Sequence, residues 1–192
     1  MKSNFFKKIL GIFGFKLIEK NLIKNKRLLN DKYLNLDLIL DHIFANHNIG
    51  NIIQIGSNDG KRFDPLNKYL QKDDAKTIFV EPIKKYYDKL KKNYAERKNS
   101  IFENSAISEN DGVLEIFKVN ENNLKFYDDH VAGISSFDKN HLLKHNVKEK
   151  HISVKKVNCL TIKTLIKKYK IINIDLFFID VEGHEGNILN NF

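Results

Sequence analysis

The stretch Ile52–Gly60, with the sequence IIQIGSNDG, decides the fold of this chain. It begins with an apolar run typical of a buried strand and continues into a polar turn with a glycine at each end. Two later segments share this design: Thr77–Glu81 (TIFVE) ends in a carboxylate, and Ile174–Gly183 (IDLFFIDVEG) ends in an Asp-Val-Glu-Gly sequence. Parallel strands bring such polar ends to one edge of the sheet, where ligands of open α/β sheets bind. The three segments therefore indicate a site for a nucleoside-containing cofactor.

Strand and helix patterns alternate from residue 51 onward. This alternation predicts an α/β fold with a mainly parallel sheet and flanking helices. Because a turn at Asp111–Gly112 precedes one of the apolar runs, that strand is expected to be antiparallel. Further strands are expected at residues 100–103, 113–117 and 151–160.

The connecting segments carry helix signals. Asp64–Pro65 is expected to start one helix, and Thr161 is expected to cap another. Apolar residues recur at helical spacing between Ile83 and Tyr94, which predicts a third helix. Residues 120–150 are polar, so this segment is expected to be rich in loops.

The sequence divides into a helical, basic and amphipathic segment at residues 1–48 and a domain at residues 49–192. Residues 1–32 hold nine lysine or arginine residues and two acidic residues, which accounts for most of the net charge of +9. The longest uncharged run there, Ile9–Phe15, is far shorter than the roughly 20 residues of a membrane-spanning helix. Two interpretations stay open: a helix on an anionic membrane surface, or a helix packed on the domain.

Composition narrows the class of protein. The single cysteine, Cys159, excludes a disulfide framework and a cysteine-based zinc site. A reducing compartment fits this content, so the expected location is cytoplasmic, with peripheral contact at the inner face of the membrane as an alternative. Residues 33–192 are nearly balanced in charge, which argues against a nucleic-acid partner.

The turn after the first strand offers several candidate binding groups. Gly56 and Gly60 permit positive φ and close approach of a ligand to the backbone. Ser57, Asn58 and Asp59 add a hydroxyl, an amide and a carboxylate between them. The Gly-x-x-x-Gly spacing differs from the Gly-x-Gly-x-x-Gly fingerprint, which counts against a dinucleotide cofactor. An ordinary strand-to-helix loop is the alternative interpretation.

Acidic residues end the next two apolar runs. Glu81 lies close to the spacing expected of an acid that binds ribose hydroxyls, and the alternative is a solvated side chain. Asp180 ends a buried strand, where a carboxylate is costly unless it is used or paired. Glu182 and His184 follow within four residues, and carboxylates with an imidazole suit several divalent ions. The sequence assigns no metal ligand, and His184 is also compatible with an ordinary surface position.

Together these motifs resemble the FkbM family of S-adenosylmethionine-dependent methyltransferases. The resemblance covers about residues 50–190 and rests on the order and spacing of the motifs, above all on Ile-Asp-Val-Glu-Gly-His-Glu. The matching segments are Gln54–Gly60, Phe79–Pro82, Asn104–Ser108, Val157–Leu165 and Phe178–Glu185.

The resemblance implies a class I methyltransferase fold, which is Rossmann-like, and S-adenosylmethionine as the cofactor. Gly56–Gly60 would hold its methionine end and ribose, and Glu81 would bind the ribose hydroxyls. Asn104 and Ala106 would lie beside the adenine. Asp180 and Glu182 would border the methionine and the acceptor side.

The implied reaction is O-methylation of a hydroxyl, often on a sugar, glycan or small molecule. A base would remove the hydroxyl proton, and the candidates are Asp180, Glu182 and His184. A divalent ion that lowers the pKa of the hydroxyl is an alternative that the sequence leaves open. Residues 120–150, including Tyr127, His130, Ser135 and Ser136, are expected to help line the acceptor site.

Family members usually continue past the last motif by one helix and about three strands, so the domain is expected to be incomplete, with sheet edges exposed or paired with another chain. Self-association is expected on this basis. An inactive remnant or a partner-binding module of the same fold is the alternative function. A different nucleotide-binding enzyme on the same sheet is a third.

Overall fold

The computed structural model describes residues 36–71 and 74–191. Its first element, helix α3 (Leu36–Asn46), follows the predicted apolar spacing, and the rest of the basic segment at residues 1–35 lies outside the described residues. The chain separates into two units between Ile43 and Phe44. The remaining elements all belong to the second unit.

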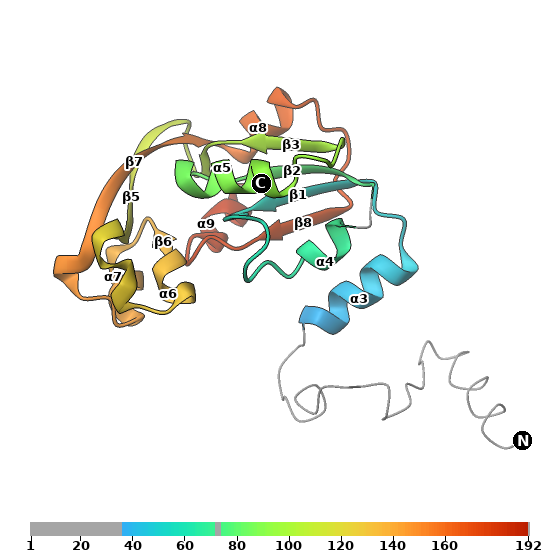
Figure 1. Ribbon diagram of the computed structural model, residues 1–192. Coiled ribbons are helices and arrows are strands. Elements are labelled where there is room, and N and C mark those ends of the chain that lie inside the picture. Colours follow the sequence, from blue (N-terminus) through green and yellow to red (C-terminus); the bar gives the residue numbers. More distant parts are fainter. Residues whose placement is uncertain (1–35, 72–73, 192) are drawn as a thin grey trace, which may run out of the picture. The chain divides into compact units, whose positions relative to one another are not determined.

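The centre of this unit is a sheet of four parallel strands in the order β3-β2-β1-β8 (Figure 1). Ile55 pairs with Val80 on one side and with Ile179 on the other, so three strands end level with one another. The predicted α/β fold with a parallel sheet and flanking helices is confirmed. The strands are β1 (Asn51–Ile55), β2 (Lys76–Val80), β3 (Ser100–Glu103) and β8 (Leu176–Ile179).

Helices cover both faces of this sheet. Strand residues alternate between the faces: Val80 belongs to a core with Leu165 and Ile188 of α8 and α9, whereas the ring of Phe79 lies 4.7 Å from that of Tyr94 at the end of α5. The apolar stripe expected at residues 83–94 is therefore the sheet-facing side of a helix. The helices are α5 (Lys84–Asn93), α8 (Ile162–Lys168) and α9 (Glu185–Asn190).

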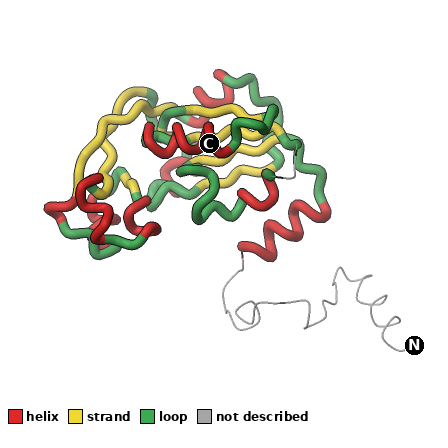
Figure 2. Tube along the Cα trace, viewed as in Figure 1, coloured by secondary structure: helices red, strands yellow, loops and turns green. Residues whose placement is uncertain are grey.

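A second sheet, in the order β4-β7-β5-β6, extends beside the first (Figures 1 and 2). Its two long strands pair antiparallel from Gly112 with Cys159 to Val119 with Ile152. The sequence predicted that the strand after Gly112 is antiparallel, but not which strand it pairs with. The short strand β4 is parallel to β7. The strands are β4 (Ala106–Ile107), β5 (Gly112–Val119), β6 (Ser135–Ser136) and β7 (Ile152–Leu160).

The segment at residues 120–150 is more ordered than the expected loop. Asn120, Asp128 and Asp138 each accept a hydrogen bond from a backbone N–H in the turn that follows, and this capping starts three of the short helices. The helices are the 3-10 helix η1 (Glu121–Phe126), α6 (Asp129–Gly133), α7 (Lys139–Lys144) and the 3-10 helix η2 (Glu149–His151).

The helix expected to start at Asp64–Pro65 is reduced to a single turn, α4 (Asn67–Leu70). The Asp64 carboxylate accepts from the N–H of Leu66 at 2.9 Å, so it closes a turn ahead of the helix. Within the described residues, no helix combines the length and apolar character needed to cross a membrane.

Candidate active site

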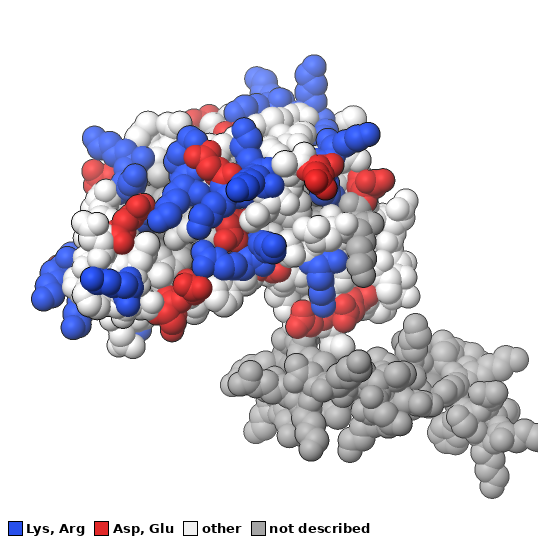
Figure 3. All heavy atoms as spheres, in the orientation of Figure 1, with Lys and Arg blue, Asp and Glu red and all other residues white. Residues whose placement is uncertain are grey.

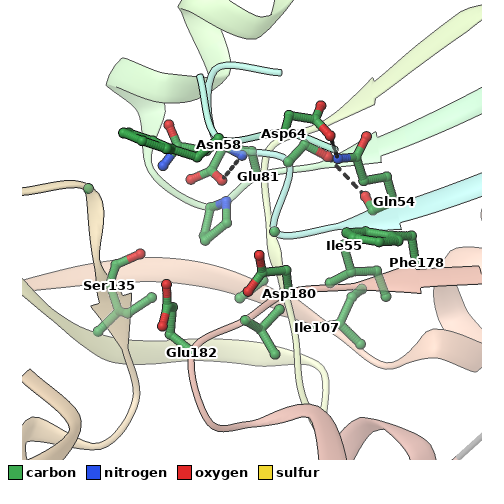
Figure 4. A pocket seen from close by; sticks show the side chains of 18 of the residues that line it. Gln54, Ile55, Asn58, Asp64, Glu81, Ile107, Ser135, Phe178, Asp180 and Glu182 are labelled. Atoms are coloured by element: carbon green, nitrogen blue, oxygen red, sulfur yellow. Dashed lines mark hydrogen bonds between the residues drawn. The ribbon is translucent and has the colours of Figure 1, made fainter. Parts of the chain in front are cut away.

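A cavity lies at the carboxyl ends of β1, β2 and β8 (Figure 4). β2 and β3 lie on one side of β1 and β8 lies on the other, so the direction of winding reverses between β1 and β8. Open α/β sheets bind ligands at such a switch point. Residues of β4, α6 and β6 close the cavity from the second sheet, including Ala106, His130 and Ser135.

The turn after β1 brings backbone to the cavity. Gly56 has φ of +80°, and a Cβ there would lie 1.8 Å from the carbonyl oxygen of Asp180, so only glycine fits between the ends of β1 and β8. The N–H groups of Gly56 and Ser57 both donate to the carbonyl of Val80, at 3.0 and 3.1 Å. Gly56, Ser57 and Asn58 all line the cavity.

Glu81 is the buried acid of the site, only 4% exposed. One carboxylate oxygen accepts from the N–H of Asn58 at 2.8 Å and the other from the N–H of Ile83 at 2.7 Å. Burial raises the pKa of Glu81 to about 7, although the two backbone hydrogen bonds oppose the rise. The structure therefore holds the carboxylate rigidly at the cavity, with one lone pair of each oxygen left for a ligand.

Asp59 and Gly60 lie outside the cavity lining. The Asp59 carboxylate accepts from the backbone N–H of Arg62 at 2.9 Å and from its guanidinium Nε at 3.0 Å. Burial alone would raise the pKa of Asp59, but the hydrogen bonds from Arg62 and Lys61 outweigh it and lower the pKa. A Cβ on Gly60 would lie 2.5 Å from Leu90 of α5. Asp59 and Gly60 thus stabilise the turn, and their neighbours Asn58 and Ser57 line the cavity.

Asn104 also lies outside the cavity lining and supports the backbone beside it. Its side-chain amide donates to the carbonyl of Glu81 at 2.8 Å and to that of Pro82 at 3.2 Å, which fixes the backbone that carries Glu81. Ser105 and Ala106 line the cavity, whereas Asn104 does not.

Asp180 and Glu182 both line the cavity and point into it (Figure 4). Burial raises the pKa of Asp180, and the nearby carboxylate of Glu182 adds to the rise. Glu182 has φ of +58°, and the hydroxyl of Ser136 donates to its carbonyl at 2.8 Å. Its carboxylate lies 2.9 Å from Nε2 of His141.

His184 does not line the cavity. Its ring meets that of Phe137 edge-on, with 5.0 Å between centroids. Its Nε2 lies 3.2 Å from a carboxylate oxygen of Glu109, at an angle unsuited to a hydrogen bond, so the contact is an ion pair only when the imidazole is protonated. Of the three candidate bases, the geometry brings Asp180 and Glu182 to the cavity and leaves His184 outside it.

Gln54 and Asp64 are site residues that the sequence analysis missed. The Gln54 amide donates to one Asp64 oxygen at 3.0 Å (Figure 4). Across the described parts of the chain, Gln54 Oε1 and Asp64 Oδ2 are buried polar atoms without a hydrogen-bond partner, and both residues line the cavity. Burial also raises the pKa of Asp64. In the sequence, Gln54 stands inside an otherwise apolar strand. Because a buried polar side chain needs a hydrogen-bond partner, this position could have indicated a site residue.

Some of the residues expected on the acceptor side line the cavity, and others do not. His130 and Ser135 line the cavity. Ser136 instead supports the backbone of Glu182, and the hydroxyl of Tyr127 lies 2.8 Å from Nδ1 of His151.

The molecule has a parallel sheet with a cavity at its switch point, a glycine turn after the first strand and a buried acid after the second. This arrangement defines a Rossmann-like fold, whose members bind ligands at this edge of the sheet. The family comparison is more specific: the model of the methyltransferase FkbM domain matches residues 54–191, well over half of the chain. The chain belongs to this family, which confirms the resemblance of its motifs and makes it a methyltransferase by family. No curated protein matches the chain.

Proposed function

We propose that the chain transfers a methyl group from S-adenosylmethionine to a hydroxyl of a sugar or another small molecule. The observation that carries this proposal is the setting of Glu81. Its two oxygens are each fixed by one backbone N–H, at 2.8 and 2.7 Å, beside a cavity at the switch point of the sheet. A carboxylate held in this way is suited to accept from the two neighbouring hydroxyls of a ribose.

The other lining groups fit the remaining parts of this cofactor. The unpartnered oxygens of Gln54 and Asp64 are acceptors for the ammonium group of its methionine end. Gly56 leaves its backbone open to close approach. Ala106 and Ile107 provide apolar surface where the base would lie.

The cofactor would supply a methyl group on a positively charged sulfur, which is a good leaving group. The protein's part is then to align the acceptor oxygen and to take its proton. Asp180 and Glu182 are the two carboxylates that face the cavity, and either oxygen pair could receive the hydroxyl proton. Partial desolvation and the nearby carboxylate of Glu182 raise the pKa of Asp180, so it accepts a proton more readily than an ordinary aspartate does.

The acceptor would enter beside α6 and β6, where His130 and Ser135 offer an imidazole and a hydroxyl. Such groups are suited to hydrogen bonding with a polar, hydroxyl-rich molecule. This is consistent with a sugar or glycan acceptor.

The test is isothermal titration of the purified chain with S-adenosylhomocysteine, the demethylated product. We expect a stoichiometry near one and binding at least tenfold weaker in Glu81→Ala, because the ribose hydroxyls lose their acceptor. Glu115→Ala is the matched control, since Glu115 is an exposed acid of β5 and should leave binding unchanged. Equal affinity in Glu81→Ala would contradict the assignment of Glu81. Absence of binding by a folded wild-type chain would leave only the family membership.

A further inference from the structure

A cluster of metal-binding side-chain types lies at one end of the cavity. His141, His145 and Glu182 each offer one ligand atom, and the three atoms lie within 4.8 Å of one another. The two histidines come from α7 and its C-terminal cap, and the glutamate comes from the segment after β8. The tertiary fold, rather than local sequence, brings the three together.

Glu182 is held in an uncommon backbone conformation that aims its carboxylate at His141. Its φ of +58° lies in the left-handed region, which is uncommon for a residue other than glycine. Ser136 secures this conformation by donating to the Glu182 carbonyl at 2.8 Å. The next residue, Gly183, has φ of +101°, and a Cβ there would lie 3.3 Å from Nδ1 of His141. The backbone thus follows the surface of the imidazole.

The two histidines are four residues apart, so they lie on the same side of α7. Their ring centroids are 4.8 Å apart. The helix that carries them is fixed by the fully buried Leu142 and by Asp138, whose carboxylate accepts from the N–H of Asn140 at 2.8 Å. The positions of both rings therefore depend on packed structure rather than on a free loop.

We propose that His141, His145 and Glu182 bind a divalent transition-metal ion of the zinc or cobalt type. Two imidazoles and one carboxylate suit such ions, whereas magnesium and calcium prefer oxygen ligands. Three protein ligands also leave at least one coordination position open, as catalytic metal sites do. Nε2 of His141 and the Glu182 carboxylate, now 2.9 Å apart, would separate by a few tenths of an ångström to admit the ion.

The open position would face the ligand cavity, because Glu182 lines both sites (Figure 4). A metal ion there would lower the pKa of an acceptor hydroxyl bound to it. This role in the reaction rests on the proposed function, but binding of the ion does not.

The test is a titration of the full chain, freed of metal by a chelator, with Co²⁺ while visible absorption is recorded. We expect one Co²⁺ per chain, displaced by Zn²⁺ and unaffected by Mg²⁺. His141→Ala and His145→Gln should each weaken binding by about 100-fold or more, since the loss of groups that merely support a ligand already costs 10–100-fold. His47→Ala, at an exposed histidine, should bind as the wild type does.

Unfolding midpoints of the metal-free variants, equal to that of the wild type, would exclude a loss of fold as the cause. Unchanged Co²⁺ binding in His145→Gln would overturn the proposal, and so would equal weakening in His47→Ala or displacement by Mg²⁺. Titration of the same metal-free chain with S-adenosylhomocysteine separates the two claims. Cofactor binding without Co²⁺ binding would reject the metal site and leave the proposed function standing.

Discussion

At the scale of single residues, the site depends on Glu81, a buried acid whose two oxygens each accept a backbone hydrogen bond. Glu81 and Asp180 could be located from the sequence because each directly follows an apolar strand, and strand ends share one edge of the sheet. Whether a turn residue faces the ligand could not be predicted. Asp59 lies one residue from Asn58, yet its carboxylate pairs with Arg62 and only Asn58 lines the cavity. Which of the two side chains faces the cavity depends on tertiary contacts, which the local sequence does not specify.

The raised pKa of Glu81 predicts a pH-dependent stability. In the folded chain this carboxyl binds a proton up to about pH 7, whereas its ordinary pKa is 4.5, so the free energy of unfolding falls as pH rises between these values. Glu81→Gln removes the titration, and between pH 5 and 8 the wild type should lose on the order of 2 kcal/mol relative to the variant. Urea unfolding of both proteins at the two pH values measures the difference. Parallel pH profiles would show that Glu81 is not a buried titrating acid.

Gly56 predicts a large cost for a single methyl group. In Gly56→Ala the new Cβ would meet the Asp180 carbonyl at 1.8 Å in a backbone of φ +80°, so we expect a loss of about 3 kcal/mol. Gly186→Ala is the control, because nothing lies within 4 Å of its Cβ and alanine favours the helix α9. The free energy of unfolding in urea should fall in the first variant and stay equal or rise in the second. Similar values in both would contradict the close approach of β1 and β8.

At the scale of elements, the sequence located strands better than helices. The apolar runs of β1, β2 and β8 are typical of strands in a parallel sheet, and few other local structures give such runs. The helix expected at Asp64 begins at Asn67 and is one turn long, and Asp64 instead closes the turn before it by accepting from the N–H of Leu66. The short helices at residues 120–150 contain too few apolar residues to give a periodic pattern. In the sequence, only the Asn and Asp residues that cap them indicate these helices.

The cap of α8 gives a prediction at this scale. Thr161 accepts from the N–H of Thr164 at 3.1 Å, so Thr161→Ala should destabilise the fold by about 1 kcal/mol. Thr161→Ser should restore most of the loss, because the hydroxyl is kept. Lys163→Ala, at an exposed position in the same turn, should have little effect. Thermal unfolding of the three variants gives the comparison, and a loss of stability in the serine variant equal to that in the alanine variant would argue against the capping role.

At the scale of the whole molecule, charge is spread over the surface whereas the candidate site is confined to one edge of the sheet. Basic and acidic side chains are interspersed on the face shown in Figure 3. One such pair, Lys85 with Glu121, lies 3.6 Å apart. The sheet concentrates its chemistry at one edge, where residues distant in sequence line one cavity. The sequence indicated this edge from three strand ends, but the wall formed by α6 and β6 depends on how the second sheet packs.

Cofactor binding should stabilise the unit that contains both sheets, residues 44–192. At a concentration 100 times its dissociation constant, S-adenosylhomocysteine should add about 2.7 kcal/mol to the free energy of unfolding. For a chain of this size that raises the unfolding midpoint by about 5–10 °C. Glu81→Ala should show a much smaller rise at the same concentration. A shift of equal size in both proteins would place the binding site elsewhere.

The most direct measurement is a crystal structure of the chain with S-adenosylhomocysteine. We predict that both ribose hydroxyls lie within hydrogen-bond distance of the Glu81 carboxylate, with the sulfur on the side of Asp180. The amino group of the ligand should contact the oxygens of Gln54 and Asp64. A ligand bound outside this cavity, or with its ribose away from Glu81, would contradict the account.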